Sequence, residues 1–152
     1  NDLMILQPDD GVIITPDRIL DFLEHHGDEI AMVLIGGVNY YSGQAFDMKA
    51  ITEKAHEYNC IVGLDLAHGA GNLILNLHDW GVDFAAWCGY KYLNGGPGAP
   101  AYLFAASEHH SQCNQPLTGW LGHARPFDFE PRPARPFIAF RISLNCLSKL
   151  LT

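Results

Sequence analysis

The sequence lacks any uncharged apolar run long enough to cross a membrane, because a spanning helix needs about 20 such residues. The densest run, residues 30–38, is nine residues long and contains two glycines. Basic residues are also few, with 9 Lys and Arg against 17 Asp and Glu in 152 residues. The formal charge of -8 argues against a general binder of nucleic acid or of anionic membranes. Nothing near Asn1 has the pattern of a signal peptide.

Cysteine is scarce as well, and its spacing does not favour a metal knuckle. The four cysteines lie 28, 25 and 33 residues apart, without a CxxC pair, at Cys60, Cys88, Cys113 and Cys146. We interpret them as reduced thiols of a cytoplasmic protein. Adjacent histidines occur at 25–26 and 109–110. Because adjacent side chains point apart in a strand and about 100° apart on a helix, neither pair is a good chelate and we expect no metal site.

Apolar residues, 48% of the chain, suffice for one domain with a real core. Short apolar runs alternate with helical patterns, which predicts an α/β fold with a mostly parallel sheet and crossover helices. The expected strands are residues 4–6, 30–35, 60–66, 82–88 and 101–105. The continuous run 30–35 predicts a strand covered on both faces.

Two helices have recognisable start signals. Thr15 is an expected N-cap, followed by Pro16 at the first helical position, and Gly27 ends this helix. Asp47 is the expected cap of a second helix over residues 48–58. One or two helical turns are expected over residues 75–80, closed by Gly81.

The pattern divides the chain into two portions. Residues 1–105 form a βαβ-type portion, and residues 106–152 form a loop-rich continuation with five prolines between 112 and 136 and a short strand expected at 137–142. The sequence begins without Met and stops as a new apolar segment begins. We therefore expect both ends to be cut from a longer chain.

Charged residues follow two consecutive strands at their carboxyl ends, the edge where parallel sheets bind ligands. Lys91 stands between two tyrosines and before a glycine-rich turn, where lost hydration favours a neutral, nucleophilic amine. Asp65 ends a buried strand and needs a cation or hydrogen-bond donors. One suitable cation is a pyridinium nitrogen, whose ring accepts electrons while a carboxylate keeps it protonated. His68 is placed to orient that carboxylate or to lie near the ring.

Each of these residues also has a plain structural interpretation. Lys91 is equally typical of a surface lysine that lies over aromatic rings. Asp65 suits a loop cap, and His68 suits a polar residue satisfied by its neighbours. Asp-x-x-His at one strand end and Tyr-Lys at the next are less common by chance than either motif alone.

These motifs resemble those of the kynureninases. The resemblance extends over residues 17–143, about a third of a full family member, and rests on five segments. They are Asn39-Tyr40-Tyr41-Ser42-Gly43-Gln44, Gly63-Leu64-Asp65-Leu66-Ala67-His68, residues 77–85, residues 87–98 and Gly119-Trp120-Leu121-Gly122-His123. Tyr-Lys-Tyr-Leu-Asn followed by Gly-Trp-x-Gly-His is a specific combination, whereas Asp-x-Ala-His occurs throughout the class V aminotransferases.

The resemblance implies part of the large domain of a fold-type I enzyme that uses pyridoxal 5'-phosphate (PLP). Such an enzyme hydrolyses L-kynurenine or 3-hydroxykynurenine to L-alanine and an anthranilate, in tryptophan catabolism and NAD biosynthesis. By position, Lys91 is the lysine that binds the cofactor covalently, and Asp65 pairs with its ring nitrogen. His68 belongs to the cofactor shell. Tyr90 contacts the phosphate and takes part in proton transfer.

The resemblance also implies a homodimer with shared active sites. Trp120 matches an indole that donates to the phosphate from the neighbouring subunit. Without the resemblance, Trp120 would be interpreted as a half-buried anchor between glycines. The later phosphate-binding segment is altered: Leu144 stands where a polar residue is usual, so Asn145 serves only after a slip of one residue.

Two further positions depart from the family pattern. Gly36 stands where a serine near the cofactor is usual, and Gly89 where Ser or Thr is usual. Each lost donor weakens phosphate binding by about 1 kcal/mol. Other parts of the family site lie outside these 152 residues, so we expect the isolated chain to bind PLP weakly and not to turn over.

Two alternatives remain open at this point. One is another class V enzyme, a cysteine desulfurase or an aminotransferase, although Gly-Trp-x-Gly-His favours a kynureninase and no mobile catalytic cysteine loop is evident. The other is a non-catalytic remnant, which the departures at Gly36, Gly89 and Leu144 support.

Overall fold

A computed structural model describes residues 3–8 and 11–110 of the chain. Its elements, in order, are α1 (Pro16–His26), η1 (Gly27–Glu29), β1 (Met32–Gly36), α2 (Met48–Glu57), β2 (Ile61–Asp65), β3 (Phe84–Cys88), β4 (Ala101–Ala105) and η2 (Ser107–His109). The predicted strand at 137–142, the cysteines at 113 and 146, and the candidates Trp120, Leu144 and Asn145 lie outside the described residues. No helix in the described part is long and apolar enough to cross a bilayer.

Both predicted helix starts are confirmed, because each has a side chain that accepts an otherwise unpaired backbone N–H. Thr15 Oγ1 accepts from the backbone N–H of Arg18 at 3.4 Å, and Pro16 opens α1. Asp47 Oδ1 accepts from the N–H of Ala50 at 3.0 Å and begins α2. These caps fix where the two helices enter the layer beside the sheet.

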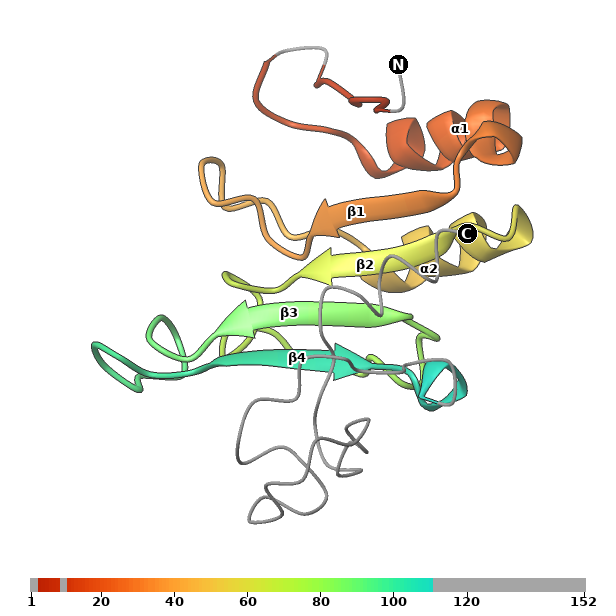
Figure 1. The fold of residues 1–152 in the computed structure, drawn as a ribbon. Coiled ribbons are helices and arrows are strands. Elements are labelled where there is room, and N and C mark those ends of the chain that lie inside the picture. The colour runs from red at the N-terminus through yellow and green to blue at the C-terminus, as the bar shows by residue number, and fades with distance from the viewer. Residues whose placement is uncertain (1–2, 9–10, 111–152) are drawn as a thin grey trace.

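The described strands form one mostly parallel sheet, as predicted. Their order is β1-β2-β3-β4, with β1, β2 and β3 parallel and β4 antiparallel to β3. The register pairs Gly36 with Asp65, and Asp65 with Ala86. The carboxyl ends of the three parallel strands therefore meet at one edge, at the left of Figure 1, where the loops that follow them gather.

The core lies between the sheet and the helices. In Figure 1, α2 lies behind the sheet. Buried apolar side chains of α1, α2, β2 and β3 meet there, among them Ile19, Leu23, Ile51, Ala55, Val62, Leu64 and Ala85. Burying each large side chain contributes about 1.5–3 kcal/mol, so this single layer contact supplies most of the hydrophobic stabilisation of the described region.

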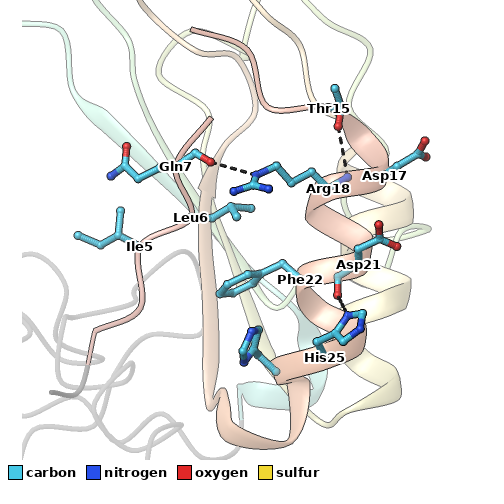
Figure 2. Close-up of a pocket in the computed structure, with 10 residues that line it drawn as sticks. Ile5, Leu6, Gln7, Thr15, Asp17, Arg18, Asp21, Phe22 and His25 are labelled. Atoms are coloured by element: carbon cyan, nitrogen blue, oxygen red, sulfur yellow. Dashed lines mark hydrogen bonds between the residues drawn. The ribbon is translucent and has the colours of Figure 1, made fainter. Parts of the chain in front are cut away.

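The predicted two-sided burial of the strand at 30–35 is wrong. The strand is β1, Met32–Gly36, and Leu34 on its second face is 69% exposed. The reason is that the described helices cover only the other face, where Val33 and Ile35 pack against the core. The predicted strand at 4–6 is also absent, because this segment runs beside α1, where Arg18 Nε donates to Gln7 O at 3.1 Å (Figure 2).

One or two helical turns are predicted at 75–80, but residues 77–80 form hydrogen-bonded turns, residues 75–76 have no regular structure, and no helix forms. The reason is that every second side chain in this segment is buried. Leu73, Leu75 and Leu77 pack against or within the core, while Ile74 is 86% exposed. Alternating burial is the pattern of an extended backbone. Trp80 N–H then donates to Asn76 O at 2.9 Å and turns the chain toward β3.

A buried carboxylate joins several elements at the opposite edge of the sheet. Asp83 precedes β3 and is 6% exposed. Its Oδ2 accepts from His56 Nε2 at 2.9 Å and from the Val62 N–H at 2.7 Å, and its Oδ1 accepts from His109 Nε2 at 2.6 Å. The buried Nδ1 of His109 has no hydrogen-bond partner in the described region. Asp83 thus ties α2, β2 and η2 to β3.

Candidate active site

Asp65 is the last residue of β2 and lies at the carboxyl edge of the sheet. Its backbone C=O accepts from the Gly37 N–H at 2.9 Å, which joins the loop after β1 to this edge. One carboxylate oxygen, Oδ1, accepts from the Ala67 N–H at 2.9 Å, so the side chain does cap its loop. The residue is nevertheless exposed, which leaves the carboxylate accessible to a bound cation.

The structure brings His68 and Lys91 together. Lys91 lies three residues past the end of β3, in a turn closed by the Asn94 N–H donating to Lys91 O at 3.0 Å. His68 lies in the loop after β2, where Asn72 Nδ2 donates to His68 O at 2.9 Å. The Nζ of Lys91 is 3.0 Å from the Nε2 of His68. Both side chains are half-buried at the edge that ends in Asp65.

A glycine explains how these two loops approach each other. Gly71 has φ +87°, a conformation that favours glycine, and a Cβ there would lie 2.6 Å from the backbone oxygen of Tyr92. The loop after β2 therefore packs directly on the loop after β3. This contact holds His68 within hydrogen-bond distance of Lys91.

Two aromatic rings flank His68. The ring of Tyr92 lies edge-on at 5.8 Å between centroids, and the ring of Tyr40 lies tilted at 6.4 Å. From the sequence, Tyr40 is expected only as part of a loop motif and not beside His68. Only the sheet order reveals this contact, because it brings the loop after β1 next to the loop after β2.

Tyr90 precedes Lys91 and is 56% exposed, so its hydroxyl is accessible to a bound molecule. The two remaining candidates from the sequence, Trp120 and Asn145, lie outside the described residues. Within residues 3–8 and 11–110, no group of three or more His, Cys, Asp or Glu side chains is arranged to hold a metal ion.

A cavity of about 530 Å³ lies elsewhere, between the segment Ile5–Gln7 and α1 (Figure 2). It is lined by side chains of mixed character, including Arg18, Asp21, Phe22 and His25. None of the predicted site residues lines it. The candidate site is instead an open surface at the carboxyl edge of the sheet.

The two glycine departures have different surroundings. A Cβ on Gly36 would meet nothing closer than Val38 O at 3.5 Å, an ordinary contact. A Cβ on Gly89 would lie 2.7 Å from Pro100 O and 3.0 Å from the ring of Tyr102, so a side chain there requires the backbone to move.

The sheet is open and mostly parallel, and its carboxyl edge carries an amine, an imidazole and a carboxylate. This arrangement is typical of a ligand-binding α/β domain. The aminotransferase class-V family profile matches residues 2–119. The chain belongs to the class V aminotransferase family.

Two curated relatives of the chain are kynureninases. The chain is 55% identical over 118 residues to a kynureninase of Flavobacterium psychrophilum, a match that covers 77% of the chain and 28% of that protein. It is 50% identical over 130 residues to a kynureninase of Myxococcus xanthus, covering 84% and 30%. The chain therefore spans less than a third of the length of these relatives.

Solved structures of the same family have the same fold. The apo cysteine desulfurase of Thermococcus onnurineus NA1 superposes with a TM-score of 0.64 at 21% identity, covering 80% of the chain and 28% of that structure. The pyridoxamine-pyruvate aminotransferase of Mesorhizobium loti superposes with a TM-score of 0.57 at 18% identity, covering 81% and 33%. At this identity the likeness concerns the fold alone.

Proposed function

We propose that the natural polypeptide carrying these residues is a PLP-dependent kynureninase, which hydrolyses L-kynurenine or 3-hydroxykynurenine to L-alanine and the corresponding anthranilate. The observation that carries the proposal is the identity of 50–55% to kynureninases over a segment that includes the candidate site. The contact between Lys91 and His68 at the edge occupied by Asp65 supports it.

The residues at this edge fit PLP. Lys91 offers a primary amine for the aldehyde, and Asp65 offers an exposed carboxylate for the ring nitrogen. In the described region, Asp65 is in no ion pair. His68 and the tyrosines around it offer aromatic surface beside both groups. When bound, PLP supplies a ring that accepts electrons from the substrate carbon.

The chain's own residues supply the remaining chemistry in this proposal. Asp65 would stabilise positive charge on the ring nitrogen of bound PLP. Lys91 would hold the cofactor through its Nζ, and the same amine would carry the substrate's α-proton. Tyr90 is assigned to the phosphate and to protonation of the product carbon. Its hydroxyl is a general-acid group directly next to Lys91 in the chain, and its side chain is exposed.

The test uses the natural polypeptide rather than an isolated piece. Incubation with PLP, reduction with borohydride and peptide mass spectrometry should find the fixed adduct on Lys91. Addition of L-kynurenine should release fluorescent anthranilate. Lys91→Ala should abolish both signals, whereas Lys49→Ala, at an exposed lysine of α2, should change neither. An adduct on other lysines only, or no anthranilate from the PLP-loaded protein, would overturn the proposal.

A second candidate is another class V activity, favoured only by the fold likeness to a cysteine desulfurase and an aminotransferase. The same loaded protein distinguishes these activities. Sulfide released from L-cysteine would identify a desulfurase, and conversion of the cofactor to its amine form by an amino acid would identify an aminotransferase. A kynureninase gives anthranilate and L-alanine instead.

We further propose a cytoplasmic homodimer in which Trp120, and Asn145 if the register slips by one residue, contact the phosphate of the partner subunit. Mixing Lys91→Ala and Trp120→Ala subunits tests this arrangement. Hybrid dimers would carry one intact site, so activity should return on mixing two inactive variants. Activity that stays absent after verified subunit exchange would contradict shared sites.

A further inference from the structure

We propose that Tyr40 is a specificity residue of the candidate site, and that its ring packs against the aryl group of the substrate. This inference rests on the proposed function, because kynurenine and 3-hydroxykynurenine are amino acids that carry an aryl ketone. It deepens that function, since it assigns the aryl end of the substrate to a residue of the loop after β1.

The ring of Tyr40 has free surface at the edge of the sheet where ligands bind. Its side chain is 82% exposed. Covering an aromatic side chain removes about 150–250 Å² from water, and this burial favours binding. A ligand with an aryl group can cover the ring, whereas a ligand without one leaves it exposed.

The turn that carries Tyr40 is fixed by hydrogen bonds on both sides of the residue. The Asn39 N–H donates to Gln44 O at 2.8 Å, and Asn39 Oδ1 accepts from the Tyr41 N–H at 2.9 Å. The side chain of Gln44 is bound to the backbone of Ile14, with Nε2 donating to Ile14 O at 2.5 Å and Oε1 accepting from the Ile14 N–H at 3.2 Å. The backbone around Tyr40 is therefore ordered before any ligand binds, which lowers the entropy cost of binding.

His68 connects the exposed ring to the amine of the site. The ring of Tyr40 is tilted by 39° to the imidazole of His68, at 6.4 Å between centroids. The Nε2 of the same imidazole is 3.0 Å from the Nζ of Lys91. A substrate that binds beside Lys91 therefore has Tyr40 as an aromatic neighbour.

The length of the substrate fits this spacing. Four single bonds join the amine nitrogen of kynurenine to its aryl ring, and they extend over about 5 Å. Paired aromatic rings lie with their centroids about 4.5–7 Å apart. An aryl group whose amine lies beside the Nζ of Lys91 is therefore long enough to pair with the ring of Tyr40.

Two neighbouring tyrosines fit this role less well. Tyr92 also lies beside His68, at 5.8 Å between centroids, but it is 45% exposed and its backbone packs on Gly71. Tyr41 is 79% exposed, but no ring contact joins it to His68 in the described region. Tyr41 is therefore a matched control, because it is the same residue type in the same turn.

The first test measures steady-state kinetics of the PLP-loaded natural polypeptide. Tyr40→Ala should raise the KM for L-kynurenine about tenfold, the upper part of the range for an aromatic pair, and leave kcat within about twofold. Tyr40→Phe keeps the ring and should keep the KM, and Tyr41→Ala should also keep it. An unchanged KM in Tyr40→Ala, or equal effects of Tyr40→Ala and Tyr41→Ala, would overturn the inference.

L-Alanine separates recognition of the aryl group from recognition of the rest of the substrate. It has the same amine and carboxylate but no aryl group, so its inhibition constant should be the same in Tyr40→Ala and in the unmodified protein. If Tyr40→Ala weakened L-alanine and L-kynurenine equally, the effect would lie in the cofactor site and the inference would be wrong.

A second test measures binding without turnover. Equilibrium dialysis with anthranilate, detected by its fluorescence, should give a Kd about tenfold higher in Tyr40→Ala and unchanged in Tyr41→Ala. A lower thermal midpoint of Tyr40→Ala with unchanged anthranilate affinity would show that the ring packs against the protein, which would refute the inference. If the unmodified protein released no anthranilate from L-kynurenine, the proposed function would fail, while an anthranilate affinity that depends on Tyr40 would keep the aryl-binding role.

Discussion

Replacing Asp83 with alanine removes a side chain that joins four elements at the amino edge of the sheet. Its carboxylate accepts three hydrogen bonds: from the N–H of Val62 in β2, from His56 in α2 and from His109 in η2. Asp83→Ala leaves all three donors without this acceptor. The candidate active site lies at the other edge of the sheet. The substitution therefore tests the stability of the fold and not the function of the site.

The magnitude follows from which donors remain buried. His56 has a side chain 39% exposed, so water can replace its partner at little cost. The His109 side chain is 13% exposed, and the Val62 N–H lies in the buried strand. Each buried bond to a charged group contributes about 1.5–3 kcal/mol, so losing these two costs about 3–6 kcal/mol. Asp83→Asn should cost less, because the amide keeps one acceptor oxygen.

Hydrogen exchange of the Val62 amide is the most direct assay, since this N–H loses its partner and reports the opening of β2. The opening free energy of this amide should fall by about 3–6 kcal/mol in Asp83→Ala. Asp79→Ala, at an exposed aspartate in the same connection, should lower it by less than about 0.5 kcal/mol. Equal effects of the two substitutions would show that the carboxylate does not hold the edge together.

Three further predictions concern other parts of the described region. Gly71→Ala should lower stability by at least about 2 kcal/mol, measured as a reduced thermal midpoint, because it adds left-handed strain to a backbone clash. Burial raises the pKa of the Cys60 thiol, so peptide mass spectrometry should show iodoacetamide modifying Cys60 at least about tenfold more slowly than the partly exposed Cys88. The ion pair with Lys54 lowers the pKa of Glu24, so its contribution is present above the ordinary glutamate range and is lost as the pH falls through the folded value. Glu24→Gln should flatten the dependence of the thermal midpoint on acid pH, and an unchanged slope would contradict this.

Local signals in the sequence predicted much of the fold. Thr15 and Asp47 cap the helices as expected, because capping depends on a few neighbouring residues. Four of the five predicted strands formed, three of them parallel, because a short apolar run is also a local signal; the run at 4–6 did not form a strand. The errors arose where burial depends on contacts with residues distant in the sequence. The exposure of Leu34 depends on which face the helices cover, and no pattern within β1 contains that information.

The candidate site was also predicted in part from the sequence. Lys91 and Asp65 could be placed at one edge, since the carboxyl ends of neighbouring parallel strands meet there. The contact of Lys91 with His68 could not be predicted, because it depends on how two loops pack through Gly71. The cluster around Asp83 was also missed. A charged residue directly before a buried strand was the only signal, and its partners lie 21 to 27 residues away in the chain.

The glycines at 36 and 89 are departures of two different kinds. At Gly36 the surroundings accept a Cβ without a close contact, so the missing serine is a loss of a donor that the backbone does not require. At Gly89 the backbone of Pro100 and the ring of Tyr102 occupy the place of a Cβ. The turn that carries Lys91 has therefore closed around a glycine, and Gly89 also donates its N–H to Pro100 O at 2.9 Å. Serine at 36 would add a hydroxyl without moving the backbone, whereas serine at 89 would displace the turn and with it the amine on which the proposed chemistry depends.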